Sequence, residues 1–301
     1  MALHLLRVLT TLALLAASGT SGALAQTDQS TTPSELQLAY ETAIKAATNG
    51  PADVALRDLA TIRLDDPYSF IPVKEGAALM RAFGNSTHES FIGLIIPKQD
   101  PFWFVTINYT DSGHIADSEA KTWNADELLQ SLKDGTEAAN KERMERGVPA
   151  FDVVGWAEKP TYDEATHRLV WSIIGKDRGV PQNGSTINYN TYALGRQGYF
   201  ELNLVTSEEA IATDKKHAGV LLAALDYKPG QRYSDFDAST DRVAEYGIAA
   251  LIGGIAAKKL GLLAVIGVAL AKFWKIILIA VAVAGGGVFK LFGRRKSTPE
   301  A

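Results

Sequence analysis

The sequence predicts an α+β fold in which an antiparallel sheet is covered by helices, followed by a C-terminal transmembrane helix. Three observations support this prediction. Short runs rich in aromatic and β-branched residues recur between turn residues, which is typical of antiparallel strands. Apolar residues at helical spacing occur between groups of these runs. Each end of the chain carries an apolar stretch with few charges, which is typical of export signals and membrane spans.

Residues 1–25 have the layout of a signal peptide. The apolar run Val8–Ala17 is followed by small residues that end in Ala23 and Ala25, and small side chains at these two places suit cleavage directly after them. The alternative is an uncleaved N-terminal anchor, but the run is shorter than the roughly 20 apolar residues that a bilayer span needs. Residues 26–32 are mostly polar and predict a solvated linker.

Residues 33–240 are expected to form one exported α+β domain, because about one domain's length lies between the two ends of the chain. Its first half is predicted to contain two helices and several strands. Phe91–Ile96 and Phe102–Tyr109 are separated by a short loop and are expected to pair as neighbouring strands. The helices are expected at Pro33–Ala47 and Val73–Phe83, and the other strands at Val54–Leu64 and Phe70–Pro72.

A long helix is predicted from residue 125 to residue 146. Asn124 stands at its N-cap position with Glu127 three residues later, which is a capping-box pattern. Its leucines are expected to point inward, and its charged residues are expected to form a solvated face rather than a binding site. Two hairpins, a helix and a short strand follow, at Val153–Ala157 with Arg168–Ile174, Thr186–Leu194 with Tyr199–Val205, Thr206–Leu225 and Asp226–Tyr233.

The C-terminal apolar region is predicted to enter a membrane. Lysine is costly at the bilayer centre but can reach the interface from a helix end, so the single transmembrane helix is placed at residues 273–292. A helix of that length matches the hydrocarbon thickness. The basic tail, residues 293–301, is expected in the cytoplasm by the positive-inside rule. The expected membrane-interface residues are Lys272, Trp274, Lys275, Lys290, Arg294 and Arg295.

Residues 241–271 predict a glycine-rich, membrane-proximal helix. Lys258 and Lys259 would lie near mid-membrane if this helix spanned the bilayer, so it is expected to lie in the interface. Its small residues would allow close approach to another helix, either of a second copy of the chain or of another membrane protein. The alternative is a two-pass hairpin that turns at Lys272–Lys275, which would place the basic tail outside and is disfavoured for that reason.

Composition and motifs narrow the possible chemistry. The chain has no cysteine, which excludes thiolate metal sites and cysteine nucleophiles. Its net charge of -4 provides no basic field, so nucleic acid is not an expected partner. His88 and Glu89 begin a zincin pattern, but Ile92 stands where the second histidine would be. We therefore expect no metal and no cofactor.

The best candidates for acid–base catalysis are Asp163, Glu164 and His167, because a carboxylate beside an imidazole can orient it. All three fall in a predicted hairpin turn, where such residues also serve backbone hydrogen bonds. An envelope hydrolase that uses them is the alternative to a non-enzymatic protein. Asp235, Asp237 and Asp241 resemble part of a calcium site, but no EF-hand glycine or glutamate follows, and helix capping is the favoured interpretation.

Seven short segments carry a family resemblance. They are W-N-A-D-E-L-L at Trp123–Leu129, K-D-G-T-E-A-A-N at Lys133–Asn140, T-H-R-L-V-W at Thr166–Trp171, N-Y-N-T-Y-A-L-G-R at Asn188–Arg196, L-N-L-V-T at Leu202–Thr206, Y-S-D-F at Tyr233–Phe236 and A-A-K-K-L-G-L-L-A at Ala256–Ala264. With these segments the run from Trp103 to Ala257 resembles a bacterial family of membrane-anchored proteins defined by a domain of unknown function, number 2167.

That resemblance implies a signal peptide, an exported domain and a C-terminal anchor, and it implies no catalytic residues. The order of elements also looks like the small α/β sandwiches of the PsbP and Mog1 type, which favours binding over catalysis. The expected location is therefore the bacterial inner membrane, with one span, the main domain in the periplasm and the C-terminus in the cytoplasm. The favoured function is a non-enzymatic binding or assembly module, whose partners are the lipid bilayer and either another copy of the chain or another membrane protein.

Overall fold

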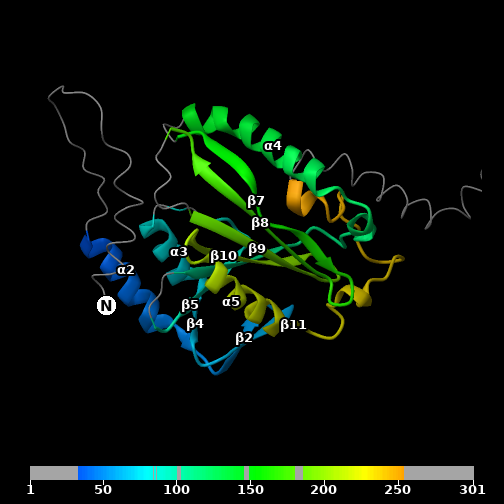
Figure 1. The fold of residues 1–301 in the computed structure, drawn as a ribbon. Helices are drawn as coiled ribbons and strands as arrows, with labels where there is room; N and C mark the ends of the chain where they lie inside the picture. Colours follow the sequence, from blue (N-terminus) through cyan, green and yellow to red (C-terminus); the bar gives the residue numbers. More distant parts are fainter. Residues whose placement is uncertain are drawn as a thin grey trace, which may run out of the picture.

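A computed structural model describes residues 33–83, 85, 87–99, 103–145, 149–179 and 186–253 of the 301-residue chain (Figure 1). The predicted signal peptide, the linker, the transmembrane helix with its interface residues and the cytoplasmic tail all lie outside these residues, as does the predicted membrane-proximal helix from residue 254 on. The described chain has a mixed α+β fold with a large antiparallel sheet and helices, as the sequence predicts.

The first half of the domain matches the expected elements with one exception. Residues Val54–Leu64 are two strands rather than one, because the chain turns at Arg57, whose φ of 54° is left-handed, and the two halves pair as a hairpin. Phe91–Pro97 and Phe104–Thr110 are neighbouring antiparallel strands, which confirms their predicted pairing. The elements are α2 (Pro33–Ala46), β1 (Thr48–Asn49), β2 (Ala52–Leu56), β3 (Ala60–Leu64), β4 (Tyr68–Pro72), α3 (Val73–Ala82), β5 (Phe91–Pro97) and β6 (Phe104–Thr110).

The second half contains both predicted hairpins and both predicted helices. Asn124 caps the long helix, because its Oδ1 accepts the backbone N–H of Asp126 at 2.9 Å and its side chain lies 3.3 Å from the Glu127 carboxylate. The strand expected within Asp226–Tyr233 is limited to its beginning. The elements are η2 (Ser118–Lys121), α4 (Ala125–Glu145), β7 (Phe151–Asp163), β8 (Arg168–Asp177), β9 (Thr186–Leu194), β10 (Tyr199–Ser207), α5 (Ile211–Ala224), β11 (Leu225–Tyr227) and η3 (Tyr233–Asp235).

The large sheet has the strand order β1-β4-β5-β6-β10-β9-β8-β7, and a small sheet has the order β11-β3-β2. One face of the large sheet packs against α5 and the small sheet, around a core that includes Phe200, Leu202 and Leu204. Figure 1 shows α5 with the small sheet near it, and α4 along the β7 end of the large sheet. The main core therefore lies between the two sheets and α5.

The opposite face of the large sheet is covered at its two ends. Leu94 of β5 and Trp171 of β8 point to this same face, because they are joined through directly paired residues of β6, β10 and β9. Leu94 belongs to a cluster under α2 and α3, and Trp171 to a cluster that includes Leu128 of α4. The helices on this face pack on β4, β5 and β7, which leaves the middle strands β6, β10 and β9 between them.

Residues 231–253, which we call the C-terminal strap, complete the covered side. Ala244, Ile248 and Ile252 are buried in the cluster that contains Leu128, and the strap pairs with the strand-like residue His114 through Val243. The exported domain therefore continues past residue 240, where the sequence placed its end, and the region expected to be helical from residue 241 is packed, non-helical chain up to residue 249. Within the described residues, none of the helices has the length and apolar character needed to cross a bilayer.

Candidate functional site

The predicted acid–base residues are not brought together around one point. Asp163 forms the β7–β8 turn, because its carboxylate accepts hydrogen bonds from the Ala165 backbone N–H at 2.9 Å and the Thr166 hydroxyl at 2.7 Å, which lower its pKa. Glu164 pairs with Lys121 at 2.8 Å, and both side chains are largely exposed. Two of the three candidates therefore serve the turn and the surface.

His167 instead belongs to a group of aromatic residues beside the strap. It has a left-handed φ of 54°, and its Nδ1 lies 3.0 Å from the Tyr162 hydroxyl and 3.5 Å from the Asp117 carboxylate. The Tyr162 hydroxyl itself donates to Asp117 at 2.7 Å, and burial raises the pKa of Tyr162. The His167 ring stacks on Tyr233 with the ring centres 4.1 Å apart. Its visible role is to hold the strap.

His114 continues this stack and fixes the same segment. Its ring lies 4.2 Å from the Tyr233 ring and 3.9 Å from the Phe236 ring, centre to centre. Burial lowers the pKa of His114, so the neutral imidazole is favoured. Asp241, expected from the sequence to cap a helix or resemble a calcium ligand, accepts two hydrogen bonds from Arg196 at 2.7 and 2.9 Å. In the described parts of the chain, no group of three or more histidines and carboxylates is arranged to hold a metal.

A different candidate lies on the open middle of the sheet. A hollow of about 170 Å³ is lined by Phe151 of β7, by Trp171, Ile173 and Gly175 of β8, by Asn188 and Asn190 of β9 and by Asn203 of β10. We call this hollow the asparagine groove. It lies between the covered β8–β7 side and the β6 strand, and it was not predicted from the sequence.

Strand register explains how the asparagines meet. Asn203 pairs directly with Asn190 on one side and with Thr106 on the other, and Asn190 pairs with Trp171. Directly paired residues share a sheet face, so this row crosses the groove from β6 to β8. Asn188 stands two residues before Asn190 on the same face. Three amides therefore gather from segments that are distant in the sequence.

The amides of the groove are only partly used inside the protein. Asn203 donates to the Asn188 side chain at 3.5 Å, the limit of a hydrogen bond, and its own Oδ1 is buried without a donor. The Trp171 indole N–H is also buried without an acceptor of good geometry, although the Tyr192 hydroxyl is close to it. Buried polar atoms without a partner are rare, and each one marks a place where a ligand or water can bind.

A buried carboxyl group stands in the next row of the sheet. Glu201 pairs in register with Asn108 and Tyr192, accepts a hydrogen bond from the Tyr192 hydroxyl at 3.1 Å and lies 3.4 Å from the Asn108 amide nitrogen. Burial raises the pKa of Glu201 above its ordinary value. The local environment therefore favours the uncharged carboxyl group, so this row adds little negative charge near the groove.

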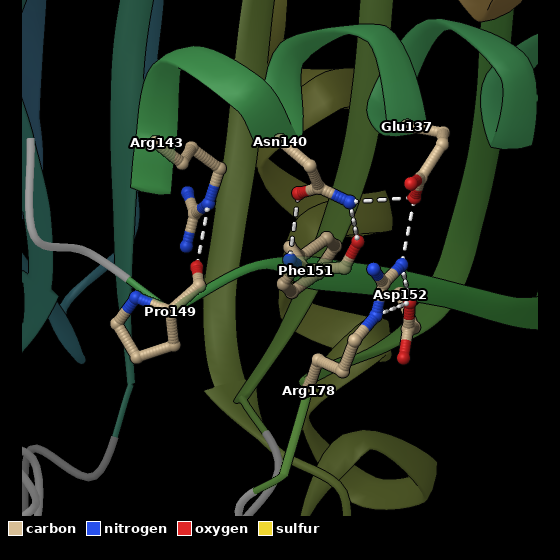
Figure 2. Close-up of polar contacts among 7 residues, drawn as sticks. All are labelled: Glu137, Asn140, Arg143, Pro149, Phe151, Asp152 and Arg178. Atoms are coloured by element: carbon tan, nitrogen blue, oxygen red, sulfur yellow. Dashed lines mark hydrogen bonds and ion pairs between the residues drawn. The ribbon is translucent and has the colours of Figure 1, made fainter. Parts of the chain in front are cut away.

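The wall of the groove is fixed by a clamp from α4, shown in Figure 2. The buried Asn140 side chain accepts the Phe151 backbone N–H at 2.7 Å and donates to the Phe151 carbonyl at 2.9 Å, as a neighbouring strand would. Arg178 then joins Glu137 of α4 at 2.7 Å to Asp152 of β7 at 2.6 Å. The charged face of α4, expected to be only solvated, thus attaches the helix to the sheet.

The Phe151 ring lies where a side chain of Gly175 would be. A Cβ atom built on Gly175 would approach the Phe151 ring to 2.0 Å, so the ring occupies this space only because residue 175 is glycine. Arg143 of α4 lies 5.7 Å from the centre of the same ring and donates to the Pro149 carbonyl at 3.0 Å. The clamp and the glycine together position an aromatic ring at the groove.

Comparisons with known proteins identify a family and two distant structural similarities. No curated protein matches the sequence. The solution structure of a cyanobacterial PsbP from Synechocystis sp. PCC 6803 is 8% identical, with 60% of this chain and 91% of that chain covered and a TM-score of 0.37. The crystal structure of a protein of unknown function, PA94 from Pseudomonas aeruginosa, is 9% identical, with 59% and 97% covered and a TM-score of 0.24.

The family model described as "Protein of unknown function (DUF2167)" matches residues 48–282, which include nearly all of the described domain and the strap. Segments that carried the resemblance in the sequence contribute directly to the groove and its wall: Asn140, Trp171, Asn188, Asn190 and Asn203. The chain belongs to this family of unknown function, DUF2167.

Proposed function

We propose that the chain is a membrane-anchored binding module of the bacterial cell envelope, which holds an uncharged polar ligand in the asparagine groove and performs no chemistry on it. The observation that carries this proposal is the groove itself. Three asparagines and a buried carbonyl oxygen without a donor face an open hollow, whereas the histidines and carboxylates singled out in the sequence are bonded into a turn and into the strap.

The lining of the groove supports binding rather than catalysis. None of its seven residues is ionisable, and none is a hydroxyl or thiol nucleophile. Asp163 and Glu164, which the hydrolase alternative requires beside His167, are engaged with the turn and with Lys121. The geometry therefore gives the hydrolase alternative no comparable support.

The location is part of the same proposal. The apolar segment at residues 273–292 and the basic tail after it are placed by their composition as a single inner-membrane span with a cytoplasmic end, and the signal peptide places the main domain in the periplasm. The strap is packed into the domain up to residue 253. A domain joined in this way would be held close to the membrane, with the glycine-rich segment available to a second copy or another membrane protein.

The proposal is tested by photo-crosslinking in living cells. A photoreactive residue is placed in the full-length chain at Asn188, which is exposed in the groove, and in a matched variant at Val220, which is exposed on α5 against the other face of the sheet. Light should yield a specific adduct at position 188 and not at position 220. Equal labelling at the two positions, or none at position 188, would show that the groove is not the binding site.

A further inference from the structure

The groove asparagines stand on a grid whose dimensions are set by the sheet. Asn203 and Asn190 lie on paired strands, which are about 4.8 Å apart. Asn188 and Asn190 are separated by two residues of one strand, a rise of about 6.8 Å. These spacings are comparable to the width of one pyranose ring, so a single sugar ring lying on the sheet can reach all three amides.

The amide groups match the hydrogen-bonding character of hydroxyl groups. Each asparagine offers a donor and an acceptor, and a hydroxyl group can serve as either. The Asn203 Oδ1 lacks a donor and the Trp171 indole N–H lacks an acceptor of good geometry, so the groove presents one of each to the same ligand. Neighbouring hydroxyl groups of a sugar supply both.

The charge of the groove selects against ionic ligands. A phosphate or carboxylate would find no cation among the lining residues, and Arg178 beside Phe151 is already bound to Asp152 and Glu137. A cationic ligand would find no ionised lining residue, and burial of Glu201 raises the pKa of that carboxyl group. A neutral ligand avoids the cost of an unpaired charge.

The shape of the groove favours part of a chain over a small enclosed molecule. The volume of about 170 Å³ is below the roughly 300–1,000 Å³ of typical small-molecule pockets. The rings of Phe151 and Trp171 stand at one side and offer apolar surfaces to the C–H groups of a sugar. A peptide would instead be expected to add to a sheet edge, whereas β9 and β10 are interior strands paired on both sides.

We infer that the asparagine groove binds a neutral oligosaccharide, with one sugar ring over Asn188, Asn190 and Asn203 and against Phe151. This inference rests on the proposed function and names its ligand class. It goes beyond that function because a binding module could equally recognise a peptide or an acidic glycan through a different set of side chains.

The test measures binding to the full-length chain in detergent micelles. The probes are maltotetraose, cellotetraose and chitotetraose as neutral oligosaccharides, tetragalacturonate as an acidic one and tetraalanine as a peptide. At least one neutral probe should bind, and Asn203→Ala should weaken it about tenfold through the loss of the amide and its contacts. Gln37→Ala, which removes an exposed amide on α2, should leave the affinity unchanged.

The outcomes separate this inference from the proposed function. Binding of tetraalanine or tetragalacturonate in preference to the neutral probes would overturn the sugar assignment, and so would no binding of any neutral probe, while a specific adduct at position 188 in cells would still support a binding module. Neutral-probe binding that survives Asn203→Ala and Trp171→Phe unchanged would place the sugar elsewhere and also overturn the inference. Trp171→Phe keeps the packing and removes the indole N–H, which controls for a folding defect in the first variant.

Discussion

Two neighbouring regions of one sheet face treat their polar residues in opposite ways. On the covered β8–β7 side, Asn140, Arg178 and Arg196 have their hydrogen bonds filled by main chain or carboxylates. In the open middle, Asn203 retains a buried oxygen without a donor, and Asn188 is exposed. The same side-chain amide is therefore structural at one place and available at the other, and only the surroundings decide which.

This comparison also reverses the value that the sequence assigned to different residue types. Histidine and carboxylate residues attract attention because they titrate or ligate metals, yet His167 and Asp241 are engaged in holding the strap. Asparagine carries no such signal and forms the candidate site. Residue type alone thus separates these two regions poorly, and partner saturation separates them well.

The largest expected effect is on the covered side. Asn140→Ala removes both hydrogen bonds to the Phe151 main chain and leaves a backbone N–H without its partner, so the free energy of unfolding should fall by about 2–3 kcal/mol. Urea unfolding followed by tryptophan fluorescence measures this. Gln130→Ala on the exposed side of the same helix should change it by less than about 0.5 kcal/mol. Equal effects of the two variants would deny Asn140 its clamping role.

A smaller effect is expected where the strap joins the sheet. Arg196→Gln removes the cation that holds the Asp241 pKa well below its ordinary value, so the melting temperature at pH 7 should fall by several degrees. A lowered carboxyl pKa gives stability that is present above the unfolded-state pKa of about 3.9 and is lost as the pH falls further. The difference between the variant and the unchanged protein should therefore shrink in strong acid.

The control for this variant is the exposed pair of Arg63 and Asp53, whose charged groups lie 3.8 Å apart. Arg63→Gln should leave the melting temperature unchanged, because exposed ion pairs contribute little. If Arg196→Gln behaved in the same way at pH 7, the strap would have to be held by its apolar contacts alone.

The sign of the effect reverses at Glu201. Because burial raises the folded-state pKa of this carboxyl group, its stabilising contribution is complete below the unfolded-state pKa of about 4.3 and is lost as the pH rises through the folded-state pKa. Glu201→Gln should therefore raise the melting temperature by a few degrees at pH 7 and have almost no effect near pH 4. The exposed Glu208→Gln should show neither change. A lower melting temperature for Glu201→Gln at pH 7 would contradict the burial argument.

The sequence predicts local structure better than it predicts the site, for physical reasons visible in particular residues. The capping pattern at Asn124 and the hairpins around β7–β8 and β9–β10 depend on neighbouring residues, and they form as expected. The Arg57 turn was missed because apolar residues continue on both sides of it. The strap was missed because Ile248 and Ile252 have the hydropathy of a membrane segment, and hydropathy does not separate lipid from a protein core.

The candidate site could not be predicted because it depends on strand register. Asn188, Asn190 and Asn203 meet only when β9 and β10 pair in one register, and a shift of one residue would turn every side chain to the other face. The unpaired Asn203 oxygen is likewise a property of the assembled sheet. A sequence pattern records the alternation of side chains but not which strand lies beside which.

The smallest expected effect tests the open region directly. The side chain of Asn188 is exposed, and its one printed contact is the 3.5 Å hydrogen bond from Asn203, so Asn188→Ala should change the free energy of unfolding by less than about 0.5 kcal/mol in urea titrations. The hydrogen bonds from Ser172 and Asn190 go to the Asn188 backbone carbonyl and survive the substitution. A loss as large as that of Asn140→Ala would mean that the groove asparagines are structural too, and the contrast between an occupied and an available amide would fail.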